Sequence, residues 1–147
     1  MIQRAAEDLS TLYEADETAW LDAMAELIRQ GRFDRLDYAH LREYLEDMAK
    51  RDRREVKSRL LVLITHMLKW TYQPRKRTRS WRGTILNQRW ELGEDVRGGV
   101  LRNHAEEVLR KVYAQAVKQA AAETGLPAKT FPAECPYTLD QLLSEDF

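Results

Sequence analysis

The segment VKSRLLVLITHMLKWTYQPRKRTRSWRGTILNQRW, residues 56–90, joins the most apolar part of the chain to its most basic part. Residues 56–72 place apolar side chains over most of a helical wheel, so we expect a central helix that other helices surround. Pro74 ends this helix, because the residue before a proline is pushed out of the helical region. Thr78 or Ser80 can cap the helix that follows.

Helical periodicity predicts further helices on both sides of this segment. The expected helices cover about residues 14–30, 38–50, 80–96 and 100–124, with a short one at 138–143. Gly31 and Gly125 stand where left-handed caps would end two of them, and Asp37 and Thr138 can cap two others. Residues 50–54, KRDRR, are either a charged turn or the exposed start of the central helix. No period-two strand is evident. We therefore expect an all-α, compact helical bundle of five main helices plus a short C-terminal helix, forming a single domain over residues 1–147.

Composition narrows the cellular setting. The single cysteine, Cys135, allows no intramolecular disulfide and no CxxC-type zinc site, which favours a reducing compartment. Residues 1–17 are acidic and polar and lack the apolar core of a signal peptide. The longest apolar run, residues 60–68, is about nine residues, well below the roughly 20 that a membrane span needs. We expect a cytoplasmic protein that does not enter the membrane.

The charges are distributed unevenly, although the net charge is zero. Between Lys50 and Arg89 there are 13 Lys and Arg but only two acids, so the rest of the chain is acidic overall. Arg and Lys neutralise phosphates, and aromatic faces stack on unpaired bases. The candidate binding residues lie in the basic turn, residues 69–89: Lys69, Arg75, Lys76, Arg77, Arg79, Arg82 and Arg89, with Trp70 and Trp81.

These residues predict a non-enzymatic module that binds a polyanion such as nucleic acid, or an acidic protein surface. The alternative is a homo-oligomeric or partner-binding protein whose basic block pairs with acidic helices, either within the fold or across a homodimer. Both interpretations need surface charges and no cofactor.

A metal-binding or enzymatic bundle is a further alternative. Glu43 and Asp47 share a helix face, and His66 would lie near them if the helices that carry them were antiparallel. The chain has neither an ExxH repeat nor an HxxxH motif, which favours a hydrogen-bonded histidine at a helix edge. Cys135 has no histidine nearby in sequence, and Glu134 beside it disfavours a thiolate, so we expect it to have a packing role. We therefore expect no metal and no catalytic residue.

Four stretches carry a family pattern: HMLKW at 66–70, YQP at 72–74, SWRGTI at 80–85 and FPAECPYTLDQLL at 131–143. With YEADETAWLDAMAELIRQGRFDRLD and HLREYLEDM, they make the chain resemble the bacterial domain of unknown function 29 family over residues 13–147. The resemblance implies an all-helical domain without an established activity, cofactor or substrate. The matching positions are His66, Lys69, Trp70, Gln73, Pro74, Ser80, Trp81, Arg82 and Cys135. Family members often have two adjacent acids where this chain has Arg42 and Glu43. This difference weakens the hypothesis of a metal-binding or enzymatic site built on carboxylates.

Overall fold

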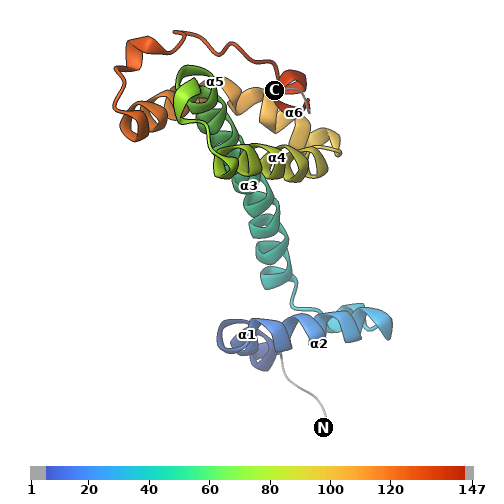
Figure 1. Cartoon of the computed structure of the whole chain (residues 1–147). Helices are drawn as coiled ribbons and strands as arrows, with labels where there is room; N and C mark the ends of the chain where they lie inside the picture. Colours follow the sequence, from blue (N-terminus) through green and yellow to red (C-terminus); the bar gives the residue numbers. More distant parts are fainter. Residues whose placement is uncertain (1–5, 145–147) are drawn as a thin grey trace. The chain divides into compact units, whose positions relative to one another are not determined.

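The described part of the chain, residues 6–144 of the computed structural model, consists of α-helices and short 3-10 turns without any strand (Figure 1). The α-helices are α1 (Ala6–Ala15), α2 (Glu17–Arg29), α3 (Tyr38–Tyr72), α4 (Arg79–Asp95), α5 (Gly99–Thr124) and α6 (Leu139–Leu143). The 3-10 turns are η1 (Phe33–Arg35), η2 (Pro74–Lys76) and η3 (Ala128–Thr130). The all-α prediction is confirmed. Residues 1–5 and 145–147, which include the ends of the predicted domain and of its family-like region, lie outside the described part.

The first helices differ from the expected one at residues 14–30. The Asp16 side chain accepts a hydrogen bond from the Ala19 N–H at 3.1 Å, which fixes the start of α2 at Glu17. The preceding α1 was not expected, because its apolar stripe is short. Gly31 has φ 71°, the left-handed conformation predicted for the end of α2.

The largest difference lies in α3, which is one helix of 35 residues where two helices, at 38–50 and 56–72, were expected. The KRDRR segment is helical and mostly exposed. It contains no Gly or Pro, and Arg and Lys are good helix formers, so the helix continues although its apolar stripe is interrupted. Within residues 6–144 there are five long helices and a short C-terminal one, as predicted, but α1 is new and two expected helices are merged.

Contacts divide the chain into two compact units, Met1–Lys50 and Arg51–Phe147. The first unit has Trp20 at its centre, completely buried against Leu9 and Met24. The Trp20 indole N–H donates to Asp37 Oδ2 at 3.1 Å, and the ring packs edge-on against Tyr13. A single domain over residues 1–147 stays a prediction. The buried residues of the described part form two clusters and not the one core expected around residues 56–72.

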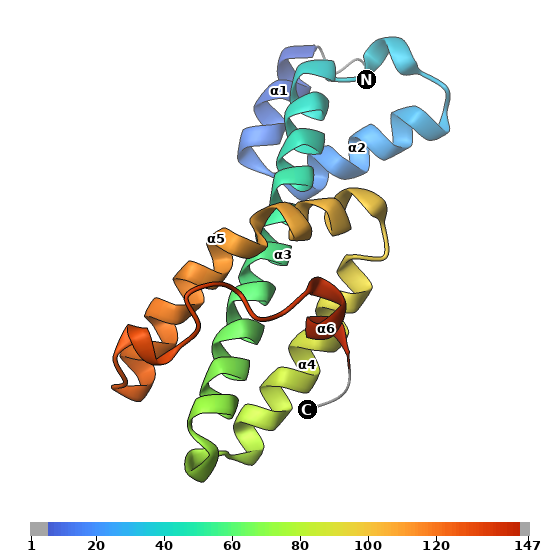
Figure 2. The ribbon, with the colours of Figure 1, turned by 90° about the horizontal axis from the view of Figure 1, so that it is seen from above.

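The second unit is built on the C-terminal half of α3. Figure 2 shows α4 and α5 running beside this half, with the C-terminal segment passing from the end of α5 back to α4. The central helix expected at 56–72 is indeed buried, since five of its apolar residues have no exposed surface. These residues are Val56, Leu60, Leu63, Ile64 and Leu68. They pack against Ile85 and Leu92 of α4 and against Ala116 and Ala120 of α5.

The segment after α5 closes the second unit. Gly125, with φ 77°, ends α5 as predicted. Phe131 then packs edge-on against Tyr72 of α3, and Pro132 accepts a hydrogen bond at 2.6 Å from the Tyr113 hydroxyl. Thr138 forms a complete capping box at the start of α6. None of the helices described here has an apolar stretch long enough to cross a membrane.

Candidate functional site

The basic turn is shaped by two local backbone signals. Pro74 occupies the first position of η2, where its fixed φ is favourable and its missing N–H costs nothing. The Thr78 side chain accepts a hydrogen bond from the Trp81 N–H at 3.1 Å and caps α4. Of the two predicted caps, Thr78 is therefore the one used, and Ser80 is exposed in the first turn of α4. The turn is a short, structured connection between two helices.

Lys69 does not belong to the surface of this turn, although it was a candidate binding residue. Only 7% of it is exposed. Its ammonium group lies 3.3 Å from a Glu123 carboxylate oxygen and 4.6 Å from the centre of the Trp81 ring. The fold therefore uses this cation to connect α3, α4 and α5, which leaves it unavailable to a large polyanion.

Arg89 is also internal, at 5% exposure, although it was a candidate binding residue. Its Nε donates to the Leu142 carbonyl at 2.9 Å, and an Nη atom lies 3.7 Å from the Met67 sulfur. Arg89 follows Ile85 by four residues and precedes Leu92 by three, so it lies on the apolar face of the helix. Its role is to attach α6 to α4.

Arg77 is exposed but held in place. Its Nε donates to the Trp70 carbonyl at 2.8 Å, and its guanidinium carbon lies 4.7 Å from the centre of the Trp70 ring. This contact folds the turn back onto the end of α3. The guanidinium keeps further donors for an external anion, because Arg carries five N–H groups.

Three other cations of the turn, Arg75, Lys76 and Arg79, are exposed and have no ion-pair partner within residues 6–144. Arg82 is exposed as well and has a contact of its own. We call Arg75, Lys76, Arg77, Arg79 and Arg82 the exposed basic cluster. No acid interrupts it in sequence, since none occurs between Arg59 and Glu91.

The two tryptophans of the turn help to hold it against the helices. Trp70 and Trp81 are both half-buried, and each already has a cation over its ring. The predicted stacking of bases on these rings would compete with Arg77 and Lys69 on the faces that these cations occupy. Trp90 is 63% exposed, but it lies on α4 after the basic turn has ended.

Some of the cations between Lys50 and Arg89 are paired with acidic residues of the same chain. Arg59 lies 2.6 Å from Glu55, 3.2 Å from Asp95 and 3.6 Å from Glu91. Burial raises the pKa of Asp95, the charge of Glu55 adds to this effect, and Arg59 opposes it. Arg59 and Lys69 are therefore paired within the fold, with partners that come from α3, α4 and α5.

His66 is hydrogen-bonded within its own helix. Its Nδ1 donates to the Val62 carbonyl at 2.9 Å, one helical turn earlier. The metal hypothesis required two antiparallel helices, but the continuous helix α3 carries His66, Glu43 and Asp47 together. Within residues 6–144, no three His, Cys, Asp or Glu side chains converge to form a metal site.

The remaining pattern positions support the turn and the segment after α5. Gln73 is half-buried and caps η2 through its backbone, accepting from the Lys76 N–H at 2.9 Å. Cys135 donates from its sulfur to the Tyr137 carbonyl at 3.4 Å. Burial raises the pKa of the Cys135 thiol, so it stays protonated at neutral pH and is a poor nucleophile.

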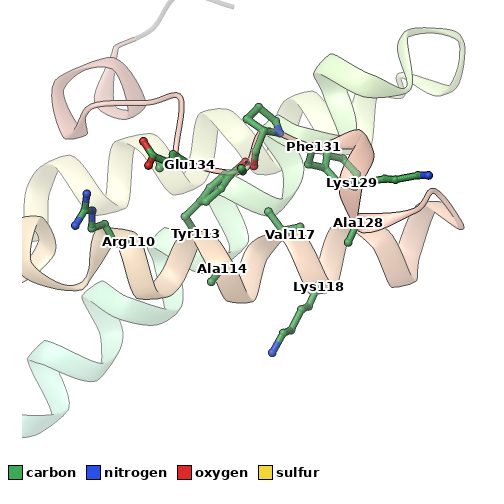
Figure 3. Close-up of a pocket in the computed structure, with 12 residues that line it drawn as sticks. Arg110, Tyr113, Ala114, Val117, Lys118, Ala128, Lys129, Phe131 and Glu134 are labelled. Carbon is green, nitrogen blue, oxygen red and sulfur yellow. Dashed lines mark hydrogen bonds between the residues drawn. The ribbon is translucent and has the colours of Figure 1, made fainter.

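A wide groove of about 800 Å³ runs between α5 and the segment that follows it (Figure 3). Tyr113, Val117 and Phe131 form its inner wall, while the side chains of Lys118 and Lys129 extend away from it. Burial raises the pKa of Tyr113 to about 12, and its hydroxyl is committed to Pro132. The Tyr113 hydroxyl is therefore not available as an acid or base in the groove.

Sequence reasoning missed one polar cluster in the first unit. His40 Nδ1 lies 2.8 Å from Asp37 Oδ2 and 3.4 Å from the Ser10 hydroxyl, and the imidazole stacks on Tyr13. Ser10 and Asp37 meet the same ring nitrogen, so this is no catalytic triad, which needs the two groups on opposite nitrogens. Burial raises the pKa of Asp37, but hydrogen bonds from His40 and Trp20 outweigh that effect and lower it. The spacing of Asp37 and His40 at a helix start was the available signal.

Comparison with known proteins gives a family and no activity. Residues 12–147 match the family described as domain of unknown function DUF29. No curated protein and no solved structure matches the chain.

Proposed function

We propose that this chain, which belongs to the DUF29 family, is a non-enzymatic binding module. It contacts the phosphate backbone of nucleic acid through the exposed basic cluster. The observation that carries this proposal is the state of Arg75, Lys76 and Arg79. They are exposed, close in sequence and without an ion-pair partner in the described part of the chain. Cations in this state gain from releasing the counterions of a polyanion.

The anchoring of the turn supports binding by a preformed surface. Thr78 caps α4, Arg77 is fixed on Trp70, and Lys69 fixes Trp81. Ordering a flexible basic tail would cost conformational entropy on binding, whereas this turn has already lost that freedom on folding. The cluster therefore presents its charges at a small entropic cost.

The covered tryptophans favour phosphate contacts over base contacts. Since a cation of the chain already lies over each of the half-buried Trp70 and Trp81 rings, unpaired bases gain less from these rings than from free ones. We expect single- and double-stranded nucleic acid to bind with weak sequence preference. If Arg75, Lys76 and Arg79 each neutralise one phosphate, they contribute roughly −3 to the slope of log K against log salt on duplex DNA.

The test is a salt titration of binding to labelled single- and double-stranded oligonucleotides by fluorescence anisotropy. The variant Arg75→Gln/Lys76→Gln/Arg79→Gln should weaken binding and flatten the salt slope. The control Arg110→Gln/Lys118→Gln/Lys129→Gln removes the same charge from three exposed residues that also lack an ion-pair partner within residues 6–144. No detectable binding at low salt, or equal losses in the two variants, contradicts the proposal.

Self-association is a second candidate, favoured by the outer face of α4. Leu86 and Trp90 are 41% and 63% exposed there, and their spacing of four residues makes them neighbours on the helix surface. A second copy could cover them while its acidic residues meet the exposed basic cluster. Sedimentation at low and high salt distinguishes this candidate, and a salt-insensitive monomer at micromolar concentration argues against it.

We also propose the bacterial cytoplasm as the compartment. The support is the single free thiol of Cys135 together with the family pattern, which resembles that of bacterial proteins. Fractionation of cells that express the chain checks this assignment.

A further inference from the structure

A second, smaller groove lies between α3 and α5 in the second unit, away from the basic turn in sequence. It has a volume of about 360 Å³, within the range of small-molecule sites. Its walls come from one face of each helix. The lining residues are Arg54, Lys57, Ser58 and Leu61 of α3, and Lys111, Val112 and Gln115 of α5.

The charge of this groove has a single sign. Arg54, Lys57 and Lys111 are exposed, and none of them has an ion-pair partner within residues 6–144. Glu55, the neighbouring acid of α3, is paired with Arg59 at 2.6 Å. Glu107 precedes Lys111 by one turn of α5 but forms no ion pair with it in the described part of the chain. Among the residues that the structure describes, no carboxylate lines the groove.

The remaining lining residues suit a ligand with an organic body. Ser58 and Gln115 add a hydroxyl and an amide at the exposed margin, where they can donate to phosphate oxygens or to polar atoms of the ligand. Leu61 is half-buried and Val112 is buried, so the floor is apolar. Three cations above an apolar floor match an anion that is attached to a flat or apolar group.

We propose that this groove binds a phosphorylated small molecule of the nucleotide class. Its phosphates contact Arg54, Lys57 and Lys111, and its organic part rests against Leu61 and Val112. A monovalent anion would leave most of the positive charge uncompensated, whereas a di- or triphosphate matches it. The groove shares no residue with the exposed basic cluster, so this inference goes beyond the proposed function.

Isothermal titration calorimetry with ATP, inorganic pyrophosphate and adenosine tests the assignment. We expect ATP to bind in the micromolar to millimolar range, pyrophosphate to bind more weakly, and adenosine to bind at least about ten-fold more weakly than ATP, because charge-assisted hydrogen bonds dominate. The comparison of ATP with pyrophosphate separates a free nucleotide from an inorganic phosphate as the ligand. Adenosine that binds as tightly as ATP overturns the proposal, as does the absence of ATP binding up to millimolar concentration.

Substitutions locate the ligand. Lys57→Gln/Lys111→Gln should weaken ATP binding about ten-fold, since each side chain loses a charge-assisted contact. Lys118→Gln removes one charge from the same helix outside the groove and should change the affinity less than about two-fold. The single variants Lys57→Gln and Lys111→Gln replace the double variant if its circular dichroism shows that it does not fold. Unchanged affinity in the groove variants places the ligand elsewhere and overturns the proposal.

The two proposals can fail separately. Arg75→Gln/Lys76→Gln/Arg79→Gln should keep the wild-type affinity for ATP, because none of these residues lines the groove. If this variant loses ATP binding while Lys57→Gln/Lys111→Gln retains it, ATP binds at the exposed basic cluster and the groove has no role. Loss in the groove variant alone supports a separate nucleotide site.

Discussion

Replacing Lys69 by methionine separates the structural cations of the basic turn from its exposed ones. Lys69 is 7% exposed and lies between the Glu123 carboxylate and the Trp81 ring. Methionine keeps a long apolar side chain but removes the charge. We expect Lys69→Met to destabilise the second unit without changing the number of exposed cations in the turn.

The magnitude follows from the two contacts that are lost. A largely desolvated cation–π contact contributes about 1–2 kcal/mol. The ion pair contributes at most about 1 kcal/mol, because the Glu123 side chain is 38% exposed and water screens it. Methionine also avoids the cost of burying an ammonium group, which offsets part of the loss. The net loss is therefore about 1–2 kcal/mol. Lys69→Ala additionally removes the buried stem and should cost about 2 kcal/mol more.

Urea denaturation followed by circular dichroism measures both variants, and the oligonucleotide titration is repeated under conditions where each is folded. Lys69→Met should bind nucleic acid like the wild type, in contrast to Arg75→Gln/Lys76→Gln/Arg79→Gln. The reasoning is refuted if Lys69→Met is as stable as the wild type. It is also refuted if Lys69→Met weakens binding as much as the triple variant, since Lys69 would then contact the ligand directly.

Three further predictions concern single residues. Because the folded-state pKa of Asp37 is lowered from 3.8, its ionised form stabilises the first unit above that value, and this contribution is lost as the pH falls below it. In an acid titration followed by circular dichroism, Asp37→Asn should therefore lose less stability below about pH 4 than the wild type, and parallel curves would contradict this. Gly125→Ala should lower the free energy of unfolding by about 1 kcal/mol in a thermal melt, because alanine is strained at φ 77°. An unchanged melting temperature would show that the helix cap adapts to the substitution. Cys135 should react with a thiol reagent more slowly in the folded chain than in urea at the same pH, because burial raises the pKa of its thiol. Equal rates would place the thiol at the surface.

The ends of the helices could be predicted from the sequence because the signals for them are local. Pro74, Thr78, Gly125 and Thr138 act through the backbone within a few residues of their own positions, and the structure uses all four as expected. Local signals failed where none was present. The KRDRR segment has neither a breaker nor an apolar residue, so periodicity stopped although the helix did not.

The candidate site was predictable in composition but not in its division into buried and exposed cations. The spacing of Arg89 from Ile85 and Leu92 did contain the information that it faces the core, but its charge argued for the surface. The Leu142 carbonyl that makes its burial tolerable is 53 residues away in sequence. No pattern within α4 reveals such a partner.

The sequence by itself determined the all-helical class, most helix boundaries and the concentration of positive charge in residues 69–89. These properties depend on backbone preferences and on charge, which each residue carries with it. Only the tertiary structure decided that Lys69 and Arg89 are internal while Arg75, Lys76 and Arg79 remain exposed. It also brought Lys57 and Lys111 to the same groove from helices far apart in the chain. The physical reason is that burial and pairing depend on groups that meet only when the chain has folded.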